Sequence, residues 1–391
     1  MRAFQYYMKT EVVFGAGAEA QVASLTQKHG GSRCLVVYGG GSAVRSGLLQ
    51  RVCDRLQAAG IYCETFGGVQ PNPRLTHARE GVRQAIAMKA DFMLAVGGGS
   101  VIDTAKAIAH GAANPETDIW DFWMKKAPLT KTMPVGVVLT IPAAGSETSD
   151  SAVLTNEEMQ RKTGTTTDLN RPAFAILDPA LAATLPKYQV ACGVTDILMH
   201  TLDRYFNPAS DNETSDAMAE ALLRVVLKNG TKVYADPGDL HAMSEIMWCG
   251  SLSHNGLTGL GGLKDFAPHQ LGHAISAAYD VAHGASLAAI WPCWARYVAE
   301  ADGYARFAQF ARNVWAVEAA DDRAAAMKGI DLQEAYFRSL DMPVRLYEMG
   351  VDAPDPERLT ELCSYGYTRT IGAFRVLDAA DIRAIYEAAN R

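Results

Sequence analysis

The first half of the chain alternates short apolar runs with stretches of helical periodicity. Five apolar or β-branched runs recur between residues 33 and 179: Cys34–Tyr38, Tyr62–Phe66, Phe92–Val96, Pro134–Thr140 and Ala173–Leu177. Such runs, separated by helical stretches, are typical of parallel strands joined by helical crossovers. The pattern therefore predicts a Rossmann-like α/β domain with a parallel sheet over residues 1–185.

The second half of the chain has a different pattern. Long amphipathic runs such as Asp211–Lys228 and Asp302–Glu318 predict helices, and no run there predicts a strand. Pro179 and Pro186 mark the change between the halves, because proline and the residue before it resist helical continuation. We expect an all-helical C-terminal domain over residues 186–391.

Composition agrees with two ordinary globular domains. A chain of 391 residues exceeds the length of about 250–300 at which one hydrophobic core stops growing. The net charge of −7, without a basic cluster, argues against a nucleic-acid surface. We predict neither a signal peptide nor a membrane span. Seven cysteines without a C-x-x-C pair fit a reducing cytoplasm, where we expect the protein to reside.

Glycine-rich turns follow two of the predicted strands. Gly39-Gly40-Gly41-Ser42 and Gly97-Gly98-Gly99-Ser100 each connect a strand to a helix. Glycine allows positive φ and close approach of a ligand, and a helix N-terminus offers free N–H groups to a phosphate. Neither turn is the G-x-G-x-x-G fingerprint, so plain turn chemistry is the alternative to a nucleotide site. A third polar turn, after Thr140, contains Ser149 and can also be a capped helix start.

Metal-binding residue types are concentrated in the helical half. Asp196 and His200 are four residues apart, as are His269 and His273, and His283 precedes a glycine. Residues i and i+4 share one helix face, and a carboxylate with several imidazoles suits a divalent first-row ion. Spacing alone selects His273 as the partner of His269. The alternative is that each histidine is a separate, hydrogen-bonded helix residue.

Several of these motifs together resemble the iron-containing (group III) alcohol dehydrogenase family, and the resemblance covers nearly the whole chain. Within the family the chain is most similar to the NADPH-dependent butanol dehydrogenase and broad-range aldehyde reductase branch. The residues that carry the resemblance are Ala95–Asp103 with Lys106, Pro142–Glu147, Gly193–Asp196 with His200, and His269 to His283-Gly284.

The resemblance implies roles for individual residues. The metal ligands fall on Asp196, His200, His269 and His283, and His273 becomes a residue that supports the ligands or relays a proton. The pyrophosphate turn falls on Gly97 to Ser100 with Asp103 close by. The implied cofactor-binding residues are Gly39, Gly40, Gly41, Ser42, Asn72, Gly97, Gly98, Gly99, Ser100, Asp103, Thr140, Ser149 and Lys162. For Lys162 the alternative is an exposed loop lysine.

Cofactor choice depends on Gly40. The resemblance implies that, in NAD-preferring members of the family, the corresponding strand ends in an aspartate. This aspartate binds the adenosine ribose and would repel a 2′-phosphate. This chain has Gly40 at that place, with Ser42 and Arg45 as a potential donor and charge partner. We therefore expect NADP(H) to be preferred over NAD(H).

The resemblance implies reversible hydride transfer between NADP(H) and a primary alcohol or aldehyde, with one divalent ion, Fe²⁺ or Zn²⁺, as Lewis acid. The resemblance also implies a homodimer, in which Phe4–Phe14 could pair with a neighbour's edge strand. The alternatives are an NAD-dependent polyol dehydrogenase of the glycerol or propanediol type, a dehydroquinate-synthase-like lyase, and a non-catalytic nucleotide-binding protein.

Overall fold

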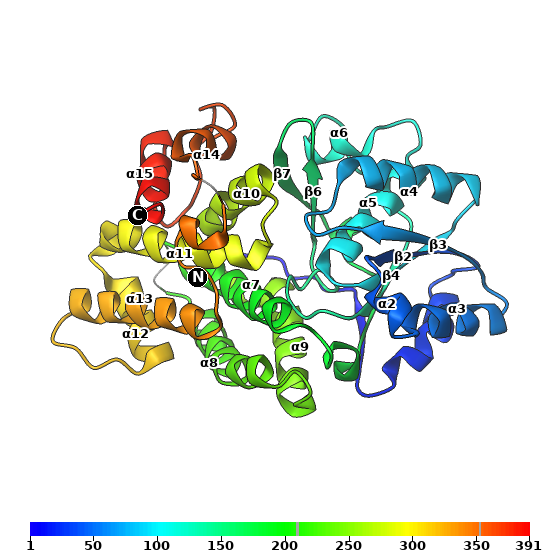
Figure 1. Cartoon of the computed structure of the whole chain (residues 1–391), viewed down its shortest axis with the longest axis horizontal. Coiled ribbons are helices and arrows are strands. Elements are labelled where there is room, and N and C mark those ends of the chain that lie inside the picture. Colours follow the sequence, from blue (N-terminus) through cyan, green and yellow to red (C-terminus); the bar gives the residue numbers. More distant parts are fainter. Residues whose placement is uncertain (209–210, 352) are drawn as a thin grey trace. The chain divides into compact units, whose positions relative to one another are not determined.

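The computed structural model describes residues 1–208, 211–351 and 353–391. The chain forms two compact units, one of residues Tyr7–Thr184 and one of Leu185–Arg391 together with Met1–Tyr6. We call them the sheet unit and the helical unit (Figure 1). Among the described residues, no helix is long and apolar enough to cross a membrane.

A six-stranded sheet, in which all neighbouring strands are parallel, forms the centre of the sheet unit. Its strand order is β1-β8-β5-β4-β2-β3. The chain runs from β2 outward to β3 and returns to the other side of β2 with β4, so the order reverses between β2 and β4. Ligands of open α/β sheets bind at the carboxyl ends of the strands at such a reversal. The strands are β1 (Glu11–Phe14), β2 (Arg33–Gly39), β3 (Tyr62–Val69), β4 (Phe92–Gly97), β5 (Val135–Leu139) and β8 (Phe174–Leu177).

Helices cover both faces of this sheet (Figure 1). Val22 and Leu25 of α1 and Val52 and Leu56 of α3 pack with the apolar side chains of β2, β4, β5 and β8 in one buried cluster. A second cluster joins α4, α5 and α6. Because both faces are covered, the central strands are apolar on both sides, as in Phe92–Gly97. These helices are α1 (Val22–Lys28), α2 (Ser42–Arg45), α3 (Leu48–Ala58), α4 (Leu75–Ala87), α5 (Gly99–Ala113) and α6 (Ile119–Trp123).

The five predicted strands are confirmed as β2, β3, β4, β5 and β8. The helix expected after the first glycine turn is two helices, α2 and α3, because Gly47 adopts a positive φ of 72° between them. The segment Phe4–Phe14 differs from the prediction in part. Its last four residues form β1, which pairs with β8 of its own sheet. Pairing of the remaining residues with a second copy of the chain stays a prediction.

An antiparallel hairpin, β6 (Ser151–Asn156) with β7 (Arg161–Thr166), was not predicted. The sequence of β7 is RKTGTT and contains no apolar residue, so no hydrophobic alternation marks it as a strand. The 3₁₀ turns of this unit are η1 (Ala18–Gln21), η2 (Asp168–Asn170) and η3 (Pro179–Ala182).

The helical unit contains no β-strand among its described residues, apart from an isolated bridge between Ile371 and Leu377. The predicted helices correspond to α8 and α12, which confirms the all-helical expectation. The helices are α7 (Lys187–Tyr205), α8 (Glu213–Ala235), α9 (Leu240–His254), α10 (Ala267–Tyr279), α11 (His283–Val298), α12 (Ala305–Trp315), α13 (Asp322–Ser339), α14 (Pro356–Cys363) and α15 (Ala379–Ala389), with 3₁₀ turns η4 (Leu257–Gly259), η5 (Ala299–Asp302) and η6 (Leu346–Met349).

Candidate active site

Helix α7 carries the first two predicted metal ligands on one face. The Asp196 carboxylate oxygen Oδ1 lies 3.2 Å from His200 Nδ1. Both residues are buried, with 4% and 5% of their surface exposed. The i, i+4 spacing therefore produces the convergence that the sequence predicts.

Helices α10 and α11 bring two more histidines to the same carboxylate. His269 Nε2 and His283 Nε2 lie 3.7 and 3.8 Å from Asp196 Oδ1. Ligand atoms of Asp196, His200 and His269 all lie within 4.8 Å of one another. Four donors from three helices thus surround one small volume of the helical unit, and we call these four residues the ligand cluster.

Gly284 explains how α11 approaches α7 closely enough. A Cβ at residue 284 would lie 2.4 Å from the backbone oxygen of Cys192 on α7. Only glycine leaves this contact open, because neither backbone can move without shifting its helix. The His-Gly pair at the start of α11 therefore places His283 beside Asp196.

Three polar atoms of the ligand cluster are buried without a hydrogen-bond partner. Within the described chain, Asp196 Oδ1, His200 Nδ1 and His269 Nε2 have no partner in hydrogen-bond geometry. Leaving a buried polar atom unsatisfied costs about 1–3 kcal/mol. Mixed nitrogen and oxygen donors that converge in this way fit a divalent first-row metal ion.

His273 and His254 lie next to the ligand cluster. The ring of His273 is 5.3 Å from that of His283 and 6.4 Å from that of His269, between centroids. His254 packs edge-on against His200 at 4.0 Å, and Arg204 approaches its Nδ1 at 3.3 Å. Sequence reasoning did not identify His254, since no other metal-binding residue type lies three or four residues before it on α9.

Burial and neighbouring charge act differently on these imidazoles. Burial, with His269 and Arg204 nearby, holds the pKa of His200 well below its usual range. Burial also lowers the pKa of His269, but Asp203 and Asp196 outweigh it and raise that pKa to about 9. The carboxylates of Asp203 and Asp196 therefore stabilise a positive charge on His269, and burial disfavours one on His200.

The glycine turns of the sheet unit lie at one edge of the sheet. Strands β2 and β4 are neighbours, with Tyr38 opposite Val96, so both turns leave the sheet side by side at its strand-order reversal. The turn after β4 owes its glycines to packing rather than to positive φ. A Cβ at Gly97 would lie 2.5 Å from Val101 Cγ2, and one at Gly99 would lie 2.9 Å from Ala144 Cβ.

The turn after β2 has open space beside its middle glycine. A Cβ at Gly40 would meet no atom within 4 Å, and Gly40 does not require a positive φ. Gly41 does, at 113°, and Arg45 Nη1 would lie 3.2 Å from a Cβ there. A side chain can therefore be introduced at residue 40 without strain.

Asp103 and Lys106 fasten the loop after β5 to helix α5. Asp103 Oδ1 accepts a hydrogen bond from Ser146 Oγ at 2.5 Å, and Oδ2 accepts one from the N–H of Val153 at 2.9 Å. Lys106 is fully buried. Its Nζ donates to the backbone carbonyl and to the hydroxyl oxygen of Ser146, and to the carbonyl of Ser151, at 2.7–2.8 Å. Both carboxylate oxygens of Asp103 are thus engaged within the protein.

The remaining predicted cofactor residues surround this loop. Thr140 follows β5, and its N–H donates to the carbonyl of Gly97 at 3.1 Å. Ser149 is buried, and its hydroxyl donates to the carbonyl of Ser151 at 3.3 Å. Lys162 is buried on β7 and donates to Asn72 Oδ1 at 2.9 Å. Lys162 is therefore not the exposed loop lysine that the sequence left as the alternative.

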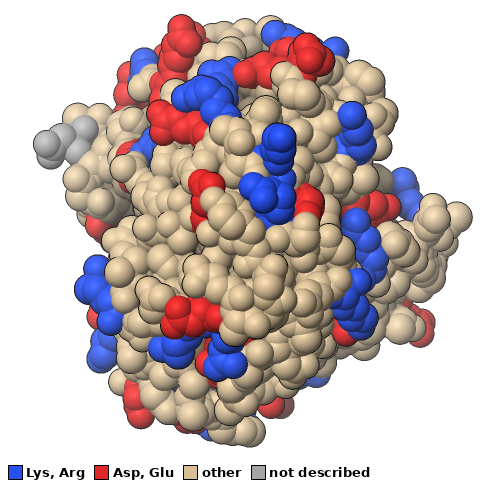
Figure 2. Space-filling view, turned by 90° about the vertical axis from the view of Figure 1, so that its right-hand side faces the viewer, with Lys and Arg blue, Asp and Glu red and all other residues tan. Residues whose placement is uncertain are grey.

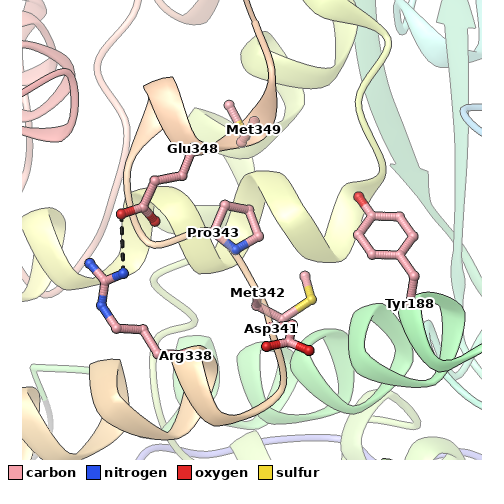
Figure 3. A pocket seen from close by; sticks show the side chains of 7 residues that line it. All are labelled: Tyr188, Arg338, Asp341, Met342, Pro343, Glu348 and Met349. Carbon is pink, nitrogen blue, oxygen red and sulfur yellow. Dashed lines mark hydrogen bonds and ion pairs between the residues drawn. The ribbon is translucent and has the colours of Figure 1, made fainter.

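A separate surface pocket of about 390 Å³ opens in the helical unit (Figure 3). Its Arg338 and Glu348 form an ion pair at 3.1 Å. No predicted site residue lines it. The lining residues are Tyr188, Arg338, Asp341, Met342, Pro343, Glu348 and Met349.

Charge on the face drawn in Figure 2 is mixed. Lys and Arg side chains lie among Asp and Glu side chains, and neither sign forms a continuous patch there. This distribution offers no basic track for a nucleic-acid backbone on that face.

A doubly wound sheet with glycine turns, and a helical unit with a carboxylate–imidazole cluster, fit the class of metal-dependent dehydrogenases. Family models agree in both halves: residues 9–179 match "Iron-containing alcohol dehydrogenase" and residues 190–390 match "Fe-containing alcohol dehydrogenase family, C-terminal". The chain therefore belongs to the iron-containing alcohol dehydrogenase family.

Its relatives carry names from the butanol dehydrogenase and aldehyde reductase branch. The chain is 36% identical to NADH-dependent butanol dehydrogenase A of Clostridium acetobutylicum, with 99% of each chain covered. It is 33% identical to the NADPH-dependent aldehyde reductase YqhD of Escherichia coli, with 100% of each covered. The crystal structure of an NADH-dependent butanol dehydrogenase A from Thermotoga maritima has a TM-score of 0.96 at 33% identity, covering 100% of this chain and 99% of that one.

Proposed function

We propose that this enzyme transfers hydride reversibly between NADP(H) and a primary alcohol or aldehyde, at a divalent ion held by Asp196, His200, His269 and His283. The observation that carries the proposal is the convergence of buried donor atoms without hydrogen-bond partners around Asp196 Oδ1. Such atoms cost stability in an apoprotein, and a ligand that satisfies them repays that cost.

The ion and the nicotinamide, when bound, supply the Lewis acidity and the hydride. The chain's own residues do the rest. Asp196 offsets part of the positive charge, and the three imidazoles fix the geometry. His273, beside His269 and His283, is placed to hold or relay a proton next to the cluster. The donor set accepts both Fe²⁺ and Zn²⁺.

On the sheet unit, we assign the cofactor's pyrophosphate to the backbone of Gly97–Ser100 at the start of α5. The close packing at Gly97 and Gly99 holds this turn rigid, and the first N–H groups of a helix attract phosphate. We assign Thr140, Ser149, Asn72 and Lys162 to the ribose and nicotinamide. The engaged oxygens of Asp103 favour a role for this residue in holding the loop after β5.

The proposed preference for NADP(H) rests on Gly40. Relatives named as NADH-dependent and as NADPH-dependent both match the chain, so their names do not decide the cofactor. A strand end without a carboxylate leaves room for the 2′-phosphate, and the open space beside Gly40 agrees with this.

Gly40→Asp tests this preference. The new carboxylate fits sterically and would repel a 2′-phosphate, so kcat/KM for NADPH should fall roughly ten- to a hundredfold, that is ~1–3 kcal/mol. The value for NADH should stay similar or improve. Steady-state rates of the metal-loaded enzyme with short- to medium-chain aldehydes measure both, and Gly40→Ala is the control.

A wild-type enzyme that already prefers NADH would remove NADP(H) from the proposal. An unchanged cofactor ratio in Gly40→Asp would show that residue 40 does not contact the adenosine ribose. Either result leaves the metal site untouched.

A propanediol-type dehydrogenase is the second candidate. The 1,3-propanediol dehydrogenase of Klebsiella pneumoniae is 28% identical over 92% of each chain. Rates with 1,3-propanediol and 1-butanol, measured side by side, separate the two candidates.

A homodimer and a cytoplasmic location also stay proposals, and light scattering of the purified protein tests the homodimer.

A further inference from the structure

A carboxylate that the sequence analysis did not select lies directly behind the ligand cluster. Asp203 is on α7, seven residues after Asp196 and three after His200, so the three side chains share one helix face. Asp203 is completely buried, and its Oδ2 lies 2.5 Å from His269 Nδ1. A charge buried this deeply needs a strong partner, and the imidazole of His269 provides it.

The two ring nitrogens of His269 face different groups. Nδ1 faces Asp203, and Nε2 faces Asp196 Oδ1 at 3.7 Å. A carboxylate only accepts hydrogen bonds, so Nδ1 must carry the hydrogen. In a neutral imidazole the lone pair then lies on Nε2, the nitrogen that points into the ligand cluster.

The backbone strengthens this arrangement. The N–H of Asp265 donates to the backbone carbonyl of Asp203 at 2.9 Å, and Asp265 Oδ2 accepts from the N–H of Ala267 at the start of α10. Helix α10 is thus attached to α7 at the level of Asp203, through the backbone and through His269. Rotation of the His269 ring would break the bond to Asp203.

We propose that Asp203 is a positioning residue for the metal. It holds His269 in the tautomer and orientation in which Nε2 is the ligand atom. This inference rests on the proposed metal site and deepens it, because partners of this kind raise the basicity of a ligating histidine and fix its ring.

The experiment measures metal affinity apart from activity. Wild type, Asp203→Ala and Asp203→Asn are stripped of metal and titrated with Zn²⁺ against a chromophoric chelator. Removal of such a partner weakens metal binding by ~10–100-fold, which we expect for Asp203→Ala. Asp203→Asn should show a smaller loss, since its amide oxygen can still accept the hydrogen bond from Nδ1.

Asp216→Asn is the matched control. Asp216 is a buried carboxylate of the same unit that pairs with Arg306 and, among the described residues, forms no ion pair with the ligand cluster. Its replacement should lower the melting temperature and leave the Zn²⁺ affinity within about twofold of wild type. Only residues that are hydrogen-bonded to a metal ligand are expected to change the metal affinity.

A spectroscopic signature separates positioning from general destabilisation. In the Co²⁺-loaded enzyme, the exchangeable Nδ1 proton of His269 should give a paramagnetically shifted proton signal. Asp203→Ala should lose or shift that signal while the signals of the other imidazoles remain. If Asp203→Ala does not fold, Asp203→Asn, which has the same volume, carries the measurement.

The possible failures are distinguishable. A wild-type protein that binds neither Zn²⁺ nor Co²⁺ overturns the proposed metal site and this inference with it. A wild type that binds metal, with both Asp203 variants as tight as Asp216→Asn, overturns the role of Asp203 and leaves the metal site standing.

Discussion

The two candidate sites use their polar side chains in opposite ways. In the helical unit, Asp196, His200 and His269 direct buried atoms without hydrogen-bond partners toward one point. In the sheet unit, the polar atoms of Asp103 and Lys106 form hydrogen bonds with Ser146 and with neighbouring backbone groups. In the proposed function, the first site offers side chains to a ligand, whereas the second uses its side chains to hold a loop and offers backbone N–H groups.

This difference predicts how each site responds to mutation. A side chain that is itself a ligand has no substitute, so its removal causes the larger loss of binding. A side chain that holds a loop acts through that loop, so its removal weakens binding by degrees. The following variants test the contrast.

His269→Ala and His283→Ala should have the largest effect. Four-ligand zinc sites contribute ~10–16 kcal/mol in total, so the loss of one ligand costs ~3–4 kcal/mol, or roughly 10²–10³-fold in metal affinity. Activity should fall with metal content. NADPH binding, followed by its fluorescence, should be largely kept because the glycine turns are unchanged. Full metal occupancy in both variants, shown by elemental analysis, would contradict the ligand assignment.

Lys106→Met should have an intermediate effect and the opposite pattern. The variant keeps the volume of the buried stem and leaves the carbonyls of Ser146 and Ser151 without their donor. Each such loss costs ~1–3 kcal/mol, so stability should fall by about 3 kcal/mol. As the loop loosens, KM for the cofactor should rise about tenfold while metal content stays normal.

The control for Lys106→Met is Lys125→Met, an exposed lysine of the same unit that forms no hydrogen bond to this loop among the described residues. If Lys106→Met lowers metal content as much as cofactor affinity, the two sites are not independent and the contrast between them fails.

The sequence identified the candidate metal ligands, which the structure brings together, better than the residues that position them. Asp196, His200, His269 and His283 are chemically distinctive, and helical spacing or family resemblance identifies each of them. Asp203 could be recognised only once α10 was known to pack beside α7, because its partner His269 is 66 residues away.

Glycines and polar strands show the same limit. The sequence marks Gly284 as following a histidine, but only the packing against Cys192 explains why it must be glycine. The central strands were predicted because both their faces are buried and apolar. The hairpin strand Arg161–Thr166 has polar residues that carry no such signal, so the sequence does not predict it and cannot exclude an exposed loop position for Lys162.

The smallest effect concerns a histidine that belongs to the sheet unit. Both ring nitrogens of His110 are engaged, Nδ1 with Thr132 Oγ1 at 2.8 Å and Nε2 with Asn170 Oδ1 at 2.7 Å. Asn170 in turn donates to the carbonyls of Asp150 and Thr165, which belong to the loop after β5 and to β7. Both nitrogens of His110 are thus satisfied by groups that hold the loop after β5, in contrast to His200 Nδ1 and His269 Nε2, which have no hydrogen-bond partner among the described residues.

The pH dependence of stability tests whether the fold holds His110 neutral. Burial lowers the pKa of His110 to about 4, despite the opposing hydrogen bond to Asn170. The unfolded chain, with a pKa near ~6.5, binds more protons than the folded chain between these values, so stability falls as pH drops from 6.5 toward 4. At pH 5 the loss of stability should be about 2 kcal/mol relative to neutral pH.

His110→Gln cannot titrate and should lack this part of the loss. Urea unfolding of both proteins at pH 7.5 and 5.0 measures the difference, in which the other titrating groups cancel, and equal losses would show that His110 is not held neutral. Metal content at pH 7.5 should be the same in both proteins, because a histidine with both nitrogens satisfied supports the fold and leaves the ligand cluster unchanged.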